Sequence, residues 1–69
     1  MNLTQDQARR EKFMVASAST RWELELLSLQ QSRELAREYH ATVECWLGEI
    51  GSRVHVLTVH PDGSFTWLI

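Results

Sequence analysis

The chain has 69 residues, a length that predicts one small domain, residues 1–69, whose core is marginal unless it is well packed or covered by a partner. A hydrophobic content of 43% and a charged content of 23% are ordinary for a globular protein. The net charge of −2 is too small to predict nucleic acid binding from bulk electrostatics.

Residues 4–16 are predicted to form a helix. Thr4 and Gln7 have the spacing of a capping box, in which each side chain binds the backbone N–H of the other residue. The apolar face of this helix is thin, so we expect it to attach weakly to the core.

A strand and a second helix are expected next. Residues 21–26 alternate polar and apolar side chains, which is the pattern of a half-buried strand. One helix over 20–40 is the alternative, but it would scatter its apolar residues around the axis. A helix that starts after Ser28, with Gln31 completing a capping box, gathers them into one stripe made of Leu29, Ser32, Leu35, Ala36 and Tyr39.

From Thr42 to Ile69 the sequence predicts three strands joined by two turns. A sheet with one face in water should alternate apolar with polar residues, but here both alternating sets are rich in Val, Leu, Trp and Phe. Each face therefore needs a cover. The helix that ends at His40 can cover one face, and the other face is left to the N-terminal helix, a second copy of the chain or a partner.

The first turn of this meander is predicted at Gly51-Ser52, with the glycine in the first position of a type II′ turn. That turn pairs Trp46 with Leu57 and Cys45 with Thr58. It places Leu57 on the face opposite to Cys45.

The second turn, Pro61–Gly63, predicts a bulge with Gly63 at positive φ. This bulge pairs Val59 with Phe65 and Leu57 with Trp67. A two-residue Asp-Gly turn is the alternative, and it would shift the register by one residue and move both aromatic rings to the other face.

Together these elements predict an α+β fold, in which an N-terminal helix precedes a β-α-β-β-β module over 21–69. The C-terminal part is a three-stranded antiparallel meander, and one helix packs on the sheet. The crossover from the strand Trp22–Leu27 to the strand that begins at Thr42 predicts a right-handed connection with these two strands parallel.

No catalytic or metal-binding constellation is recognisable. The three histidines and Cys45 lack the spacing of metal ligands, and the carboxylates form no isolated pair in an apolar setting. The single cysteine fits a reducing cytoplasm, and we expect it to be a small buried side chain rather than a nucleophile. We therefore expect no enzyme activity and no cofactor. We also expect no membrane association, because no apolar run reaches the ~18–20 residues that span a bilayer.

Candidate contact residues come from the tryptophans and from the uneven charge. Trp22, Trp46 and Trp67 are each expected either in the core or as an anchor in a protein interface. Trp46 is the best anchor, because polar residues would flank it, namely Glu44, Arg53 and His55.

The middle of the chain is acidic, with six glutamates against two arginines over 23–49. This segment is expected to be either a solvated surface or the contact for a basic partner, made by Glu23, Glu25, Glu44 and Glu49. Near the N-terminus, Arg9, Arg10 and Lys12 form either a solvated face or a contact for phosphate or an acidic partner.

The stretch Ser28–Ala36, followed by Thr42-Val43 and the strand–Asp-Gly–strand ending, resembles the small phage-encoded anti-CRISPR proteins that inhibit type I systems. The resemblance covers about residues 21–69, and the N-terminal helix departs from its simplest β-α-β-β pattern. It implies a non-enzymatic inhibitor in the cytoplasm of a bacterial host. Such a protein binds Cas subunits of the surveillance complex and blocks DNA access or nuclease recruitment. The alternatives are a structural homodimer and a small nucleic-acid-binding regulator.

Overall fold

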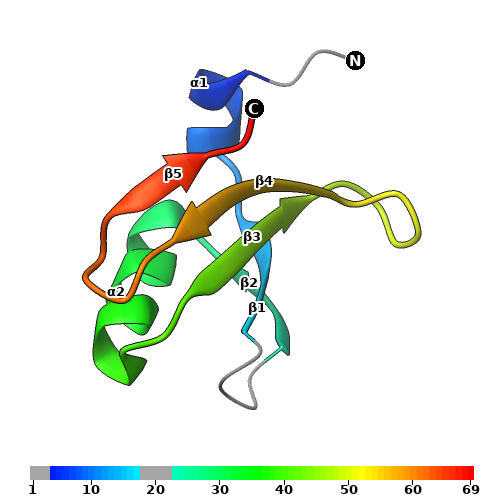
Figure 1. Ribbon diagram of the computed structural model, residues 1–69. Coiled ribbons are helices and arrows are strands. Elements are labelled where there is room, and N and C mark those ends of the chain that lie inside the picture. The colour runs from blue at the N-terminus through cyan, green and yellow to red at the C-terminus, as the bar shows by residue number, and fades with distance from the viewer. Residues whose placement is uncertain (1–3, 18–22) are drawn as a thin grey trace.

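The computed structural model describes residues 4–17 and 23–69, which form two helices and a five-stranded sheet (Figure 1). The predicted α+β class, with a helix packed on the sheet and an antiparallel meander at the C-terminal end, is confirmed. Trp22 lies outside the described residues. The elements in chain order are α1 (Gln5–Arg9), β1 (Phe13–Ala16), β2 (Glu23–Leu27), α2 (Leu29–Tyr39), β3 (Val43–Leu47), β4 (Val54–Val59) and β5 (Phe65–Trp67).

The helix expected over 4–16 is wrong beyond Arg9, because α1 ends there and β1 follows it. The predicted capping box is present. The Thr4 N–H donates to Gln7 Oε1 at 3.0 Å, and the Gln7 N–H donates to Thr4 Oγ1 at 3.2 Å. Aromatic and β-branched side chains favour a strand in Phe13–Ala16, and burial there alternates with a period of two.

The strand order is β2-β1-β3-β4-β5, and all neighbouring strands are antiparallel. The segment expected to be helical therefore supplies an inner strand. β2 and β3 are parallel to each other, as predicted, because both run antiparallel to β1. They are not neighbours, however, and α2 connects them across the inserted strand.

The structure confirms a strand followed by a helix, rather than one helix over 20–40. Ser28 and Gln31 form the predicted capping box, with backbone-to-side-chain distances of 2.9 and 3.2 Å. Ser32 and Ala36 are fully buried on the face of α2 that packs on the sheet, whereas Tyr39 is half exposed.

The predicted turn at Gly51-Ser52 is wrong, because β3 already ends at Leu47 and a longer loop leads to β4. Gly48 has a φ of +117°, which takes the backbone out of the extended region immediately after the strand. The loop projects from the body of the molecule (Figure 1), and Ile50 within it is 87% exposed.

The register between β3 and β4 differs from the prediction as a result. Cys45 pairs with Leu57, and Trp46 pairs with His55. The register shifts between these two pairs, which leaves Val56 as the extra residue of a β-bulge on β4. Val56 and Leu57 are consecutive and both fully buried, so the bulge directs two apolar side chains to the core.

The bulged register predicted for the β4–β5 hairpin is confirmed by the pairs Val59–Phe65 and Leu57–Trp67. The Gly63 N–H donates to His60 O at 2.8 Å, and Gly63 has a φ of +90°. Asp62 Oδ1 accepts hydrogen bonds from the Ser64 N–H at 2.9 Å and from the Ser64 hydroxyl at 2.6 Å. Local hydrogen bonds and one glycine therefore hold this turn.

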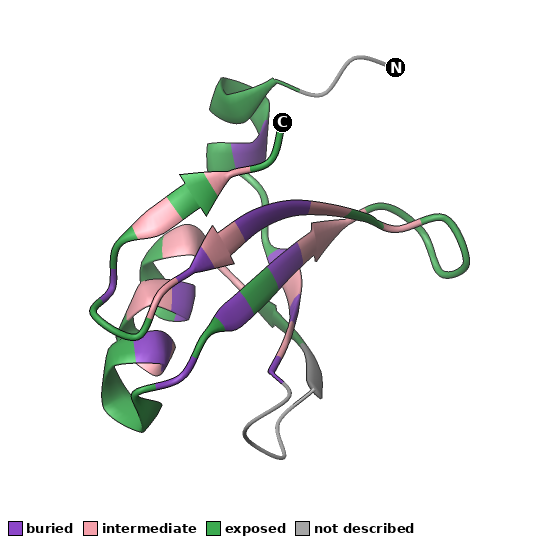
Figure 2. Ribbon diagram, viewed as in Figure 1, coloured by how far each residue is buried: buried purple, intermediate pink, exposed green. Residues whose placement is uncertain are grey.

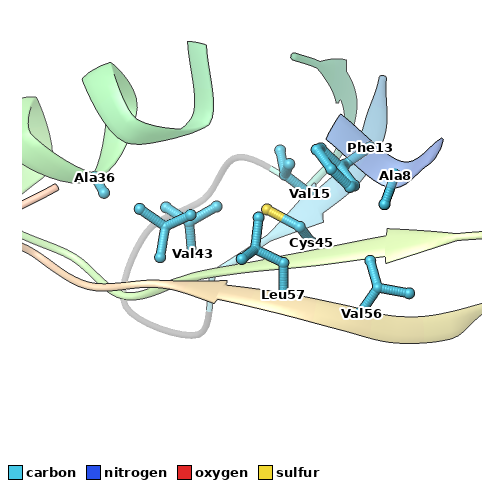
Figure 3. Packing of buried hydrophobic residues seen from close by; sticks show 9 residues of the cluster. Ala8, Phe13, Val15, Ala36, Val43, Cys45, Val56 and Leu57 are labelled. Carbon is cyan, nitrogen blue, oxygen red and sulfur yellow. The ribbon is translucent and has the colours of Figure 1, made fainter. Parts of the chain in front are cut away.

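Both helices cover the same face of the sheet. Ala8 of α1 and Ala36 of α2 belong to one buried cluster, which lies on the helix side of β3 and β4 (Figure 3). Buried residues alternate along β3 with the exposed Glu44 (Figure 2). The predicted separation of Leu57 from Cys45 onto opposite faces is wrong, because both belong to the cluster of Ala8, Phe13, Val15, Ala36, Val43, Cys45, Val56, Leu57 and Val59.

The alternation in β1 predicts unequal effects of truncating two adjacent residues. Phe13→Ala removes a fully buried ring, and we expect a loss of about 3–5 kcal/mol in the free energy of unfolding. Met14→Ala truncates a half-buried side chain on the other face, and we expect a loss of about 1 kcal/mol. Urea denaturation of both variants measures the difference. Equal losses would contradict the strand assignment.

Gly63 and Gly51 form a matched pair for testing the second hairpin. Both have a φ near +90°, so alanine strains either backbone by about 1–2 kcal/mol. A Cβ at Gly63 would also come within 2.5 Å of Arg37 Nη1 and 3.0 Å of Arg37 Cδ, whereas a Cβ at Gly51 meets nothing within 4 Å. We expect Gly63→Ala to lower the melting temperature more than Gly51→Ala, as measured by circular dichroism. The reverse order would show that Arg37 does not pack on this turn.

Candidate functional site

The face of the sheet opposite to α1 and α2 carries a row of large side chains that no described helix covers. We call this side the open face. The row crosses four neighbouring strands and consists of Leu26 on β2, Met14 on β1, Trp46 on β3 and His55 on β4. Leu26 is 59% exposed, and the other three side chains are partly exposed.

Strand alternation places these residues together. Phe13 and Val15 face the helices, so Met14 between them must face the other way. In the same manner, Trp46 follows the buried Cys45. Met14 pairs directly with both Leu26 and Trp46, and Trp46 pairs with His55, so each member of the row is opposite the next.

An aromatic stack fixes one end of the row. The rings of Trp46 and His55 have centroids 4.8 Å apart and an interplanar angle of 15°. His55 Nε2 lies 3.1 Å from the carbonyl oxygen of Leu57 and 3.1 Å from Thr58 Oγ1. These polar contacts hold the imidazole, and the imidazole in turn supports the indole.

The structure brings together only part of the predicted contact set. Glu44 precedes Trp46 by two residues on β3, so it lies exposed on the open face beside the stack. Arg53 is half-buried just before β4, and its Nε is shielded from solvent without a hydrogen-bond partner. Glu49 is exposed in the loop between the two strands.

The acidic residues of β2 do not join this group. Glu25 is exposed, but it pairs with Val15, whose side chain faces the helices, so Glu25 lies on the other side of the sheet from Glu44. Glu23 belongs to β2, and its side chain is outside what the structure describes. The acidic middle of the sequence is therefore divided between two faces.

Sequence reasoning missed Met14 and Leu26 as members of the site. Met14 was assigned to a helix, although the aromatic and β-branched residues on either side of it favour a strand. Leu26 was placed in the correct strand, but its face could not be chosen without knowing that β1 is its neighbour.

The groups considered for chemistry lie apart from one another. In the described ranges, 4–17 and 23–69, no three His, Cys, Asp or Glu side chains are grouped as metal ligands would be. His60 Nε2 contacts Thr66 Oγ1 at 2.8 Å, and His40 ends α2. Cys45 is fully buried. Burial raises the pKa of the Cys45 thiol from 9.0 to about 11, and a hydrogen bond with Ser32 opposes part of this rise.

Neither helix that the structure describes has the length and apolar character required to cross a bilayer. Comparison with protein-family models, with curated proteins and with solved structures found no match to this chain.

The raised pKa of Cys45 predicts a loss of stability in alkali. The thiol of the unfolded chain ionises near its ordinary pKa of 9.0, while the folded protein keeps its proton up to about pH 11. Below pH 9.0 the thiol is neutral in both the folded and the unfolded protein, so it has no effect on the free energy of unfolding. Above this pH the unfolded state is favoured, and the free energy of unfolding falls by about 2–3 kcal/mol across this window.

Urea denaturation across this pH range measures the effect against Cys45→Ala, which removes the thiol and leaves every other titrating group in place. The stability of the wild type should fall more steeply than that of the variant. Parallel curves would mean that Cys45 is not held in a desolvated site.

Proposed function

We propose that this chain is a non-enzymatic protein-binding module that docks a partner on the open face of its sheet. The observation that carries the proposal is the row Leu26–Met14–Trp46–His55, which lies in register across four strands without cover from a described helix. Strands are spaced ~4.8 Å apart, so the row is about 14 Å long. A surface of this kind suits the centre of a protein interface.

The residue types in the row support a role in binding a partner, and not only exposure of apolar side chains to solvent. Tryptophan is among the residues that most often supply the binding energy of an interface, and methionine adapts to the shape of a partner. The stack between Trp46 and His55 holds the indole before a partner arrives. Less conformational entropy is then lost on binding.

Charge limits the kind of partner. Glu44 stands exposed beside Trp46, and Glu49 lies in the adjoining loop. A complementary surface would present an apolar centre with lysine or arginine beside it. The half-buried Arg53 is the nearby basic residue that would meet an acidic group at the margin.

The resemblance to anti-CRISPR proteins narrows this proposal. The partner would be a Cas subunit of a type I surveillance complex in the cytoplasm of a bacterial host, and inhibition would come from steric occlusion of DNA or nuclease binding. The open face supplies the surface for such an inhibitor. The identity of the partner rests on the resemblance alone.

A structural homodimer is the second candidate, because the same apolar row could be covered by its own copy in a second chain. Light scattering at micromolar concentration separates the two proposals. A monomer removes the homodimer. If the protein is a dimer and Trp46→Ala converts it to monomers, the open face serves self-association. That result would replace the proposal that a different partner docks there.

Native mass spectrometry with purified type I surveillance complexes, and then with host extract, tests partner binding. We expect a stoichiometric complex with the wild type, and binding at least about 30-fold weaker with Trp46→Ala, since truncating a central tryptophan costs about 2 kcal/mol or more. Tyr39→Ala is the matched control, because it truncates a half-exposed ring of α2 on the other side of the sheet.

Each result bears on a separate part of the proposal. A partner from host extract that is not a Cas subunit would refute the anti-CRISPR assignment and keep the docking face, provided that Trp46→Ala weakens it. Equal weakening by Trp46→Ala and Tyr39→Ala would place the interface elsewhere. Absence of any stoichiometric complex would contradict the whole proposal.

A further inference from the structure

A second surface of the molecule gathers positive charge around the aromatic residues of β5. The guanidinium carbon of Arg9 lies 5.6 Å from the ring centre of Phe65, and that of Arg33 lies 5.4 Å from the same centre. Arg9 also lies 5.3 Å from the ring centre of Trp67. Figure 1 shows β5 between α1 and α2, which supply these two arginines.

A third arginine joins them through the turn before β5. Arg33 Nε donates to the carbonyl oxygen of Gly63 at 2.8 Å. Arg37 packs directly against Gly63, because any Cβ at that position would clash with it. Arg33 and Arg37 are four residues apart and so lie on the same side of α2. We call Arg9, Arg33 and Arg37, with the Phe65 ring and Gly63, the arginine cluster.

The positive charges of the arginine cluster are not neutralised within the part of the chain that the structure describes. None of its three guanidinium groups forms an ion pair with a described carboxylate. Asp62 is next to Gly63, but its Oδ1 binds both the N–H and the hydroxyl of Ser64. Three positive charges that lie near one another without ion-pair partners repel each other. This repulsion lowers the stability of the folded protein unless a ligand or ion compensates it.

The other acidic residues of the two helices form no ion pair with the arginine cluster. Glu34 and Glu38 each follow a cluster arginine by one residue, so they lie about 100° further round α2. Glu34 accepts a hydrogen bond from Gln30 at 3.2 Å. Asp6 is in the first turn of α1 and forms no ion pair with Arg9. These acidic neighbours disfavour a long polyanion, whose charge would extend past the cluster.

The contacts of the arginine cluster hold its guanidinium groups in positions that suit binding of an oxyanion. Contact with an aromatic ring restricts the guanidinium groups of Arg9 and Arg33, and the hydrogen bond to Gly63 uses only the Nε of Arg33. Its terminal N–H groups remain as a fork that fits phosphate oxygens. The indole N–H of Trp67 is also shielded from solvent and lacks an acceptor. Three guanidinium groups that form no ion pair with a described carboxylate suit a dianion.

From these contacts we infer that the arginine cluster binds a phosphate dianion. The ligand would sit against β5, between α1 and α2, on the side of the sheet away from the open face. The site is therefore separate from the proposed docking surface. The phosphate could be free in solution or be carried by a phosphorylated side chain, and both sources share the same dianionic chemistry.

Titration of the full chain followed by NMR tests this inference at constant ionic strength. The probes are inorganic phosphate, phosphoserine and a single-stranded oligonucleotide. We expect both phosphate probes to shift the signals of the Arg9 and Arg33 side chains and of the Trp67 indole, while the oligonucleotide binds no more tightly than phosphoserine. Tighter binding by phosphoserine than by inorganic phosphate would favour a phosphorylated side chain, and the reverse would favour free phosphate.

Variants in α1 give a matched comparison. Arg9→Gln and Arg10→Gln remove the same charge from adjacent residues, but only Arg9 lies over the aromatic rings. We expect phosphate affinity to fall about tenfold or more in Arg9→Gln, as for loss of a charge-assisted hydrogen bond, and to change less than about twofold in Arg10→Gln. Arg33→Lys keeps its charge and loses the fork, so it should bind phosphate more weakly than the wild type.

Several results would overturn the inference. They are the absence of shifts at tens of millimolar phosphate, equal weakening in Arg9→Gln and Arg10→Gln, and wild-type affinity in Arg33→Lys. Binding of the oligonucleotide without binding of phosphoserine would replace the phosphate dianion with a nucleic acid backbone as the ligand. Because Arg9 is exposed, its substitution is not expected to unfold the protein, which circular dichroism checks. Trp46→Ala should bind phosphate with wild-type affinity, because Trp46 lies on the open face. If the phosphate inference fails, the docking proposal is therefore unaffected.

Discussion

Phe13 and Val15 are fully buried on an inner strand that pairs with β2 on one side and β3 on the other. Without β1, neither neighbour would have a partner at that edge, and the sheet would be divided in two. The same two side chains also fix which face of β1 meets the helices. Because adjacent residues in a strand point to opposite sides, their burial directs Met14 to the open face. The burial of Phe13 and Val15 therefore determines both the position of the core and the position of the candidate docking surface.

A chain of this size supplies few elements with which to cover a five-stranded sheet. α1 contributes Ala8 and α2 contributes Ala36 to the same buried cluster, so both described helices serve one face. The bulge at Val56 adds to that face by burying two consecutive residues of β4. The remaining apolar residues, above all Trp46, lie on the side that no described helix covers. The one-sided core is thus the physical reason that the open face keeps large side chains without cover from a described helix.

The arginine cluster arises from the same arrangement on the helix side. α1 is short and ends at Arg9, beside β5, and α2 lies on the other flank of that strand. The aromatic residues of β5 sit at the sheet edge, so guanidinium groups from both helices can reach them. Two surfaces of different chemistry, one apolar and one basic, consequently lie on opposite sides of one thin sheet. A partner on one side and a phosphate on the other would not compete for space.

The sequence alone determined the elements whose signals are local. Both capping boxes depend on residues a few positions apart and were predicted correctly. Of the predicted stripe on α2, Ser32 and Ala36 are buried and Tyr39 is half exposed. Of the two registers considered for the turn around Gly63, the structure has the bulged one. The place of β1 depended on tertiary structure, because a four-residue strand is stabilised by two neighbours that are distant in sequence. The β3–β4 register could not be predicted from local sequence either. The bulge at Val56 is stabilised by burial of its side chain in the core, which depends on tertiary packing. Trp46, His55 and Glu44 could be named from the sequence as a group, whereas Met14, Leu26 and the arginine cluster could not. Their association exists only once β1 has entered the sheet and both helices have packed on one face of it.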